Sequence, residues 1–141
     1  MTALTRTRAL MADLATAIGL PALPQDDTGG FRLTVGAATE IFLYGGDDET
    51  ILIVAPVAPL PPEPGYGLVL YLLRSNLFDS DVAPFQIAAD DGGALIFWGR
   101  LQIAGLTGTA LASLVDRIAA RVALIRSEVT GESEAPVAKR G

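Results

Sequence analysis

Apolar residues recur at helical spacing near both ends of the chain. In the N-terminal part, one stripe of a 3.6-residue period predicts a helix that ends at Gly19 and Pro21. In the C-terminal part, a second stripe predicts a last helix, with Thr107 or Thr109 as its N-cap. The first stripe holds Leu4, Met11, Leu14, Ala15 and Ile18, and the second holds Leu111, Leu114, Val115, Ile118, Val122 and Ile125.

Between these helices, the first apolar runs have the period of two that is typical of strands. In residues 31–35, Phe, Leu and Val alternate with Arg and Thr, which predicts a half-buried strand. Residues 40–44 form a second run, and residues 51–55 form a third run that ends at Pro56. Because short turns separate the three runs, we expect an antiparallel meander.

A second hairpin follows later in the chain. Residues 85–89 and 94–103 predict two strands joined by the turn Asp-Asp-Gly-Gly. Ile96 and Trp98 fall on the opposite side of the longer strand from its other apolar residues. Trp98, close to Arg100, allows two interpretations: a small second core under a helix, or an exposed apolar anchor for a partner.

The middle of the chain predicts a helix over residues 68–78, after a stiff proline-rich connection at residues 58–67. A continuous apolar run suits a buried strand or a buried helix, and the scarcity of β-branched residues favours the helix. Two apolar stripes lie on opposite sides of it, and we expect the sheet to cover one and a second copy of the chain to cover the other. One stripe holds Tyr66, Val69, Leu70, Leu73 and Leu77, and the other holds Leu68, Tyr71, Leu72 and Ser75.

The predicted order of elements is α-β-β-β-α-β-β-α, an α/β (α+β) fold with three helices and a twisted antiparallel sheet. At 141 residues the chain can form one ordinary core, so we expect a single domain over residues 1–127. Residues 128–141 offer almost nothing to bury and predict a disordered tail.

Composition excludes many kinds of chemistry. The chain has no His and no Cys, and its single lysine is Lys139. It therefore lacks an imidazole base, a thiolate nucleophile and the usual zinc ligands, which leaves carboxylate, Tyr, Ser or Arg chemistry. The net charge of −6 disfavours nucleic acid as a partner. The longest uncharged stretches, 50–62 and 101–115, are too short to cross a membrane.

Three acidic pairs could in principle hold a cation or exchange protons. Asp26-Asp27, Asp47-Asp48 and Asp90-Asp91 each lie next to glycine in a predicted turn, where Asp bonds its own backbone. We interpret them as turn residues and expect no catalytic residue, no metal site and no cofactor. A carboxylate-dependent or metal-dependent hydrolase is accordingly disfavoured.

Four segments together resemble the Tir-chaperone family, the class I chaperones of bacterial type III secretion. They are the entry LPALPQDDTGGFRLTV, the proline-rich PLPPEPG before a helix that ends LLRSNLF, the hairpin FQIAADDGGALIFWGRL and the final amphipathic helix. The resemblance covers about residues 4–126. It implies a secretion-chaperone-like fold without enzymatic activity, a homodimer, and residence in the bacterial cytoplasm.

The resemblance also implies a partner. Such a chaperone binds the N-terminal chaperone-binding segment of one or a few secreted effectors in extended form, and keeps this cargo competent for delivery to the secretion ATPase. Family dimers pair largely through the middle helix, which maps here onto Leu68, Tyr71, Leu72 and Ser75.

An extended cargo segment can add backbone hydrogen bonds at a sheet edge and place alternate apolar side chains on surface patches. The candidate partner-binding residues are Leu10, Phe42, Tyr44, Ile96 and Trp98. The acidic rim of the protein is expected to attract basic cargo segments. The alternative to a secretion chaperone is a small, dimeric, non-enzymatic adaptor or binding domain of another system.

Overall fold

The described part of the chain folds as three helices and a five-stranded antiparallel sheet, so the predicted fold class and element order are confirmed. The structure, a computed structural model, describes residues 3–25, 29–36, 38–45, 49–77, 81–82 and 84–138, with side chains from residue 5 to residue 131. The elements are α1 (Ala3–Ala17), β1 (Phe31–Val35), β2 (Thr39–Gly45), β3 (Thr50–Pro59), α2 (Tyr66–Arg74), β4 (Gln86–Ala89), β5 (Ala94–Gln102) and α3 (Gly108–Ala138).

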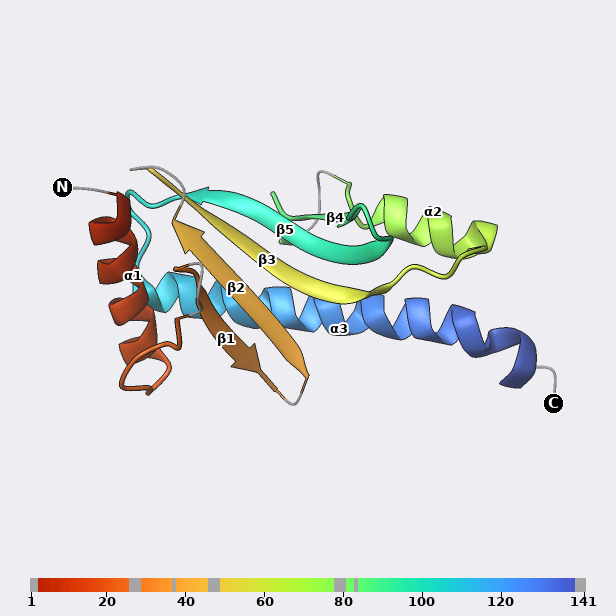
Figure 1. The fold of residues 1–141 in the computed structure, drawn as a ribbon, viewed down its shortest axis with the longest axis horizontal. Helices are drawn as coiled ribbons and strands as arrows, with labels where there is room; N and C mark the ends of the chain where they lie inside the picture. Colours follow the sequence, from red (N-terminus) through yellow and green to blue (C-terminus); the bar gives the residue numbers. More distant parts are fainter. Residues whose placement is uncertain are drawn as a thin grey trace.

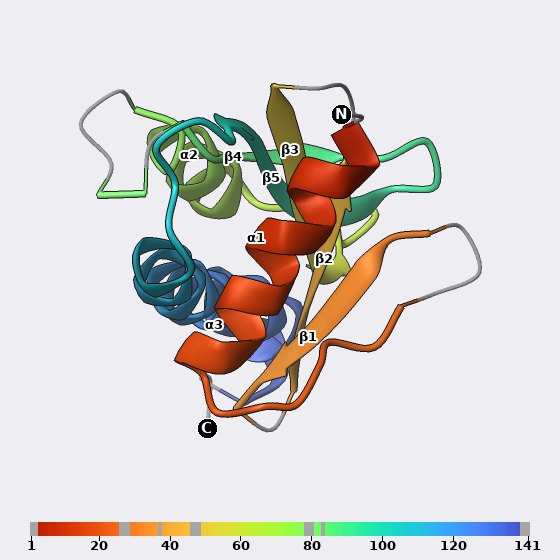
Figure 2. The same ribbon diagram turned by 90° about the vertical axis from the view of Figure 1, so that its left-hand side faces the viewer.

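The sheet has the order β1-β2-β3-β5-β4, which makes β3 central and puts β1 and β4 at the edges. Figure 1 shows α1 and α2 near opposite ends of the sheet, with α3 running between them. The buried residues of all three helices join the inward side chains of the strands in one core. Figure 2 shows this helical layer on one side of the sheet, and no helix of the described residues covers the other side.

The strands alternate as the sequence predicts. In β1, Phe31 and Leu33 are buried while Arg32 and Thr34 are exposed. The last helix also follows its predicted stripe, because all six of its predicted apolar positions are buried. Its N-cap is Thr107, the first of the two candidates, whose Oγ1 accepts a hydrogen bond from the backbone N–H of Ala110 at 3.1 Å.

Helices α1 and α3 contact each other through backbone as well as side chains. The carboxylate of Asp13 accepts a hydrogen bond from the N–H of Gly108 at 2.9 Å, at the first residue of α3. A β-carbon at Gly108 would collide with the backbone of Asp13 and Leu14. Glycine is therefore required here, because the start of α3 lies directly against α1.

The predicted end of the third strand at Pro56 is wrong, since β3 continues to Pro59. Its pairing with β5 passes through Pro56 and shifts register before Ala58, as in a β-bulge. Proline lacks a backbone N–H and is tolerated where the ladder is interrupted. The paired residues of β2 and β3 end at Phe42 and Val54, so beyond this point β3 pairs with β5 alone.

Arg126, on α3, supplies the hydrogen bonds that β2 no longer gives to this part of β3. Its Nε donates to the carbonyl of Val57 at 2.7 Å, and a terminal nitrogen donates to the carbonyl of Pro56 at 3.1 Å. The other terminal nitrogen lies 3.4 Å from the hydroxyl of Thr39 on β2. One guanidinium thus joins α3 to both strands at the place where they separate.

The last helix continues past the predicted boundary at residue 127. Helix α3 runs to Ala138, and Val129 is buried. Val129 lies four residues after Ile125 and so continues the apolar stripe of the helix. The folded part of the chain therefore includes the start of the segment that was expected to be disordered.

We predict that Arg126→Ala lowers the free energy of unfolding by about 2 kcal/mol, because two strand carbonyls lose a charged donor. The free energy of unfolding of Arg126→Lys should lie between those of Arg126→Ala and the wild type, since an ammonium lacks the planar fork that reaches both carbonyls. Urea unfolding would measure this, with the exposed Arg117→Ala as the matched control. Equal losses for Arg126→Ala and Arg117→Ala would contradict the role given to Arg126.

Candidate functional site

The side of the sheet that the helices leave uncovered is predominantly apolar. Its cross-strand neighbours run through three adjacent strands: Phe42 of β2 pairs with Val54 of β3, which pairs with Trp98 of β5. On either side of this row lie the pairs Tyr44–Leu52 and Pro56–Ile96. We call this set the outer sheet face: Phe42, Tyr44, Leu52, Val54, Pro56, Ile96 and Trp98.

None of these seven side chains is buried, whereas the alternate residues of the same strands form the core. Directly opposite residues in a sheet have β-carbons about 4.5–5.5 Å apart, so the apolar side chains form one continuous surface. The rings of Phe42 and Tyr44 stack with centroids 6.5 Å apart. Four of the five predicted partner-binding residues, Phe42, Tyr44, Ile96 and Trp98, therefore lie together.

Trp98 is half-buried by its neighbours in the sheet, and no described helix lies over it. The interpretation of Trp98 as part of a second core under a helix is therefore wrong. The guanidinium of Arg100 lies 5.6 Å from the centroid of the indole ring, a cation–π contact that holds the ring on the surface.

The charges around the outer sheet face differ from those expected. Arg32 lies opposite Phe42 on one flank, and Arg100 lies opposite Leu52 on the other. Both arginines are exposed, and the acidic Glu40 lies near Pro56. The net charge of the chain is negative, yet the aromatic row is flanked by cations, so the predicted attraction of basic cargo does not follow for this surface.

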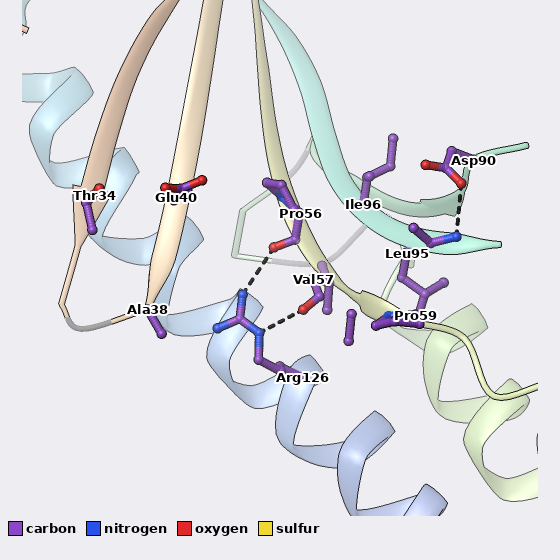
Figure 3. A pocket seen from close by; sticks show the side chains of 12 residues that line it. Thr34, Ala38, Glu40, Pro56, Val57, Pro59, Asp90, Leu95, Ile96 and Arg126 are labelled. Carbon is purple, nitrogen blue, oxygen red and sulfur yellow. Dashed lines mark hydrogen bonds between the residues drawn. The ribbon is translucent and has the colours of Figure 1, made fainter. Parts of the chain in front are cut away.

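An open cavity of about 490 Å³ adjoins the outer sheet face where β2 and β3 separate (Figure 3). Thr34 and Glu40 line it from β1 and β2, and Pro56 and Ile96 line it from β3 and β5. Arg126 closes its inner side through the bonds to the strand carbonyls. The opening lies just beyond the last pair of β2 and β3, Phe42 and Val54, where the two strands no longer pair.

Leu10, the fifth predicted partner-binding residue, lies elsewhere. It is buried in α1 on the helical side of the sheet. It lines a shallow groove of about 390 Å³ between α1 and the segment that follows β5, together with Arg6 and Asp13. The structure does not bring Leu10 to the outer sheet face.

The two stripes of α2 are assigned to the wrong environments in the sequence-based prediction. Leu68, Leu72 and Ser75 are only 4%, 8% and 6% exposed, and Tyr71 packs partly against the core. The chain itself therefore covers the stripe expected at a dimer interface, and a charge at Leu72 would disturb the core rather than an interface. Periodicity identifies both stripes, but only tertiary contacts decide which one faces inward.

The opposite stripe of α2 is the exposed one. Tyr66, Leu73 and Leu77 are 80%, 64% and 51% exposed, and Val69 is exposed as well. Beside it lies a small apolar cavity of about 190 Å³ between α2 and β4, lined by Val69, Leu72, Leu73, Asn76 and Ile87 among others. We call Tyr66, Val69, Leu73 and Leu77 the exposed α2 stripe.

The described residues offer little for catalysis. Burial raises the pKa of the Tyr71 phenol above its ordinary value of 10.0, the nearby Glu128 carboxylate raises it further, and Arg121 opposes them. This phenol is therefore neutral near pH 7. Within the described ranges, no three acidic side chains converge on a possible metal site. No described helix has the length and apolar content needed to cross a bilayer.

Of the three acidic pairs, the structure describes only Asp90-Asp91. Asp90 Oδ1 accepts hydrogen bonds from the backbone N–H groups of Gly92 and Ala94, both at 2.9 Å. Asp90 is therefore a turn residue of the β4–β5 hairpin, as predicted. The pairs Asp26-Asp27 and Asp47-Asp48 lie outside the described residues.

Comparisons with known proteins agree with this architecture. The sequence matches the Tir chaperone protein (CesT) family over residues 9–124. No curated protein sequence matches the chain. The structure is similar to the type III secretion chaperone SycH of Yersinia pestis, solved in complex with a stable fragment of YscM2, with a TM-score of 0.69 and 21% identity over 84% of this chain and 98% of that chain.

Two structures from Pseudomonas aeruginosa are also similar. A chain of the heterodimeric ExoU–SpcU complex from the type III secretion system has a TM-score of 0.70 and 27% identity, over 85% of this chain and 97% of that chain. A chain of the ExoT–SpcS complex has a TM-score of 0.65 and 20% identity, over 86% of this chain and 97% of that chain.

The family match spans the chain from α1 to late α3, so it covers all five strands, the outer sheet face and most of the core. The resemblance inferred from the sequence, and with it the prediction of a type III secretion chaperone, is confirmed. The chain belongs to the Tir chaperone protein (CesT) family.

Proposed function

We propose that this chaperone binds the N-terminal chaperone-binding segment of a secreted effector in extended form and keeps it competent for secretion. The observation that carries the proposal is the outer sheet face, seven apolar side chains on three adjacent strands with no described helix over them. A surface of this kind marks an interaction site in a soluble protein. One similar structure is described as the HopA1–SchA chaperone–effector complex, which supports a partner of the same kind.

The geometry favours a cargo segment that carries both apolar and acidic residues. Aromatic side chains supply much of the energy at protein interfaces, and the central row offers Phe42 and Trp98. Carboxylates of the cargo would lie close to Arg32 and Arg100 on the two flanks. The open cavity next to Pro56 can accept one bulky apolar side chain.

The exposed α2 stripe supports a homodimer. Its apolar side chains lie beside the apolar cavity between α2 and β4, so two copies related by a twofold axis could each insert the stripe against the cavity of the other. The interface is therefore proposed at Tyr66, Val69, Leu73 and Leu77, in place of the buried stripe.

The proposed setting is the bacterial cytoplasm, where the chaperone would hold its cargo and present it to the secretion ATPase. No enzymatic step is part of this role. The chemistry of the described residues supports this, since the half-buried Tyr71 phenol, whose pKa is raised, is neutral near pH 7.

We predict that Trp98→Asp weakens cargo binding at least about 30-fold, the loss expected for an aromatic anchor. The chaperone would be titrated with N-terminal segments of the type III secreted proteins of its own bacterium. Trp98 is the only tryptophan of the chain, so the variant has no tryptophan fluorescence, and isothermal titration calorimetry would measure the affinities of all forms in the same way. Leu124→Asp is the control, because Leu124 is 60% exposed on α3.

Equal affinities of the wild type and Trp98→Asp would rule out the outer sheet face as the binding site. If no secreted protein bound while a protein of another system did, the chain would instead act as an adaptor of that system.

We predict that the wild type sediments at twice 14.7 kDa and that Leu73→Asp sediments as a folded monomer. The substitution would force a carboxylate into an apolar contact, which costs several kcal/mol unless the charge is paired. Leu124→Asp again serves as the control, since the two leucines are 64% and 60% exposed. A monomeric wild type, or a Leu73→Asp dimer, would exclude the exposed α2 stripe as the interface.

A further inference from the structure

Strand β4 lies at the edge of the sheet and is only four residues long. A strand in this position carries a row of outward N–H and C=O groups that can pair with a strand of another chain. The second copy of the chain and an extended cargo segment are both candidates for such pairing. The structure therefore has to satisfy or expose these groups.

Asn76 satisfies two of them. Its Nδ2 donates a hydrogen bond to the carbonyl of Ile87 at 3.1 Å, and its Oδ1 accepts one from the N–H of Ile87 at 2.7 Å. A primary amide has the same donor and acceptor as a peptide group. The side chain thus takes the place that a residue of a sixth strand would occupy.

The neighbouring position on the same edge is satisfied in a similar way. The N–H of Phe85 donates to the carbonyl of Val82 at 2.9 Å. Phe85 and Ile87 are two residues apart, so their backbone groups point in the same direction, away from β5. Both N–H groups are already bonded inside the chain.

The end of α2 fixes the position of Asn76. Its backbone N–H donates to the carbonyl of Leu73 at 3.1 Å, one turn back along the chain. Its side chain lies among the apolar residues that line the cavity between α2 and β4. An amide in such surroundings is unfavourable unless it is hydrogen-bonded, and here both of its polar atoms are bonded to Ile87.

At the other edge of the sheet, β1, only some of the outward backbone groups are hydrogen-bonded within the described residues. At β1, the N–H of Arg32 donates outward to the carbonyl of Pro24 at 2.9 Å, so the start of the strand is covered. Thr34, two residues further, points its backbone groups the same way, and no described residue bonds to them. Thr34 also lines the open cavity beside Pro56.

We propose that Asn76 is a partner-selecting residue that closes the edge of β4 and so prevents this strand from pairing with a second copy of the chain. Two copies that meet through the exposed α2 stripe bring their β4 edges near the same twofold axis. With Asn76 in place the contact is made by side chains alone. Strand addition by an extended segment is thereby favoured at β1 over β4.

The inference goes beyond the proposed function, because it concerns the behaviour of the chaperone without cargo. We expect Asn76→Ala to raise the hydrogen-exchange rate of the Ile87 amide about tenfold or more, as its acceptor is lost. We also expect assemblies larger than the wild-type species, growing with concentration in sedimentation velocity. Asn76→Asp, which accepts but cannot donate, should give a smaller effect on assembly.

A second variant separates edge pairing from a loss of stability. A lysine on a sheet edge blocks pairing by another strand. Adding Gln86→Lys, at an exposed position of β4 outside the cavity between α2 and β4, to Asn76→Ala should return the wild-type size distribution while the Ile87 amide still exchanges fast. Urea unfolding of both variants would show that this rescue is not a return of stability.

An unchanged exchange rate of the Ile87 amide in Asn76→Ala would overturn the inference, as would assemblies that persist in the double variant. Neither result depends on cargo. The outcome of the cargo-binding test with Trp98→Asp is therefore independent of this one.

Discussion

The structure depends on a central strand, β3, that is apolar on both faces. Its inward residues Ile51 and Ile53 are fully buried against the helical layer. Its outward residues Leu52 and Val54 form the middle of the outer sheet face. Three helices are enough to cover one side of a five-stranded sheet, so the apolar excess of the sequence remains on the surface on the other side. A protein that holds another chain needs a surface of this kind.

Local patterns predict the elements well where alternation or helical spacing is unbroken. Residues 31–35 match β1, where apolar and polar residues alternate, and the six apolar positions of α3 that follow the 3.6-residue period are all buried. The predicted sides of β5 are also right, because successive side chains of a strand point to opposite faces, and Ile96 and Trp98 therefore lie on the same side. The turn role of Asp90 was likewise predictable, since Asp before Gly-Gly has a local backbone to bond.

The errors arise where distant residues decide. Helix α2 is apolar on two sides, and only its contacts with α3 and β4 determine that Leu72 is buried and Leu73 exposed. Proline predicts the end of a strand, but Arg126, 70 residues away, supplies hydrogen bonds that let β3 continue past Pro56. The bonds of Asn76 to Ile87 likewise join two different elements, across 11 residues of the chain. No pattern within a short window contains these contacts.

Arg126 and Asn76 act on the sheet in opposite ways. The guanidinium of Arg126 binds strand carbonyls from the helical side, and β2 and β3 separate there to leave the open cavity next to the outer sheet face. The amide of Asn76 binds both backbone groups of Ile87 and removes an edge that would otherwise accept a strand. Each is a side chain from a helix or its end that completes the hydrogen bonding of the sheet. Together they leave one apolar face, one cavity and one open edge on the same half of the molecule, around Thr34, so an extended chain bound at β1 would reach the cavity directly.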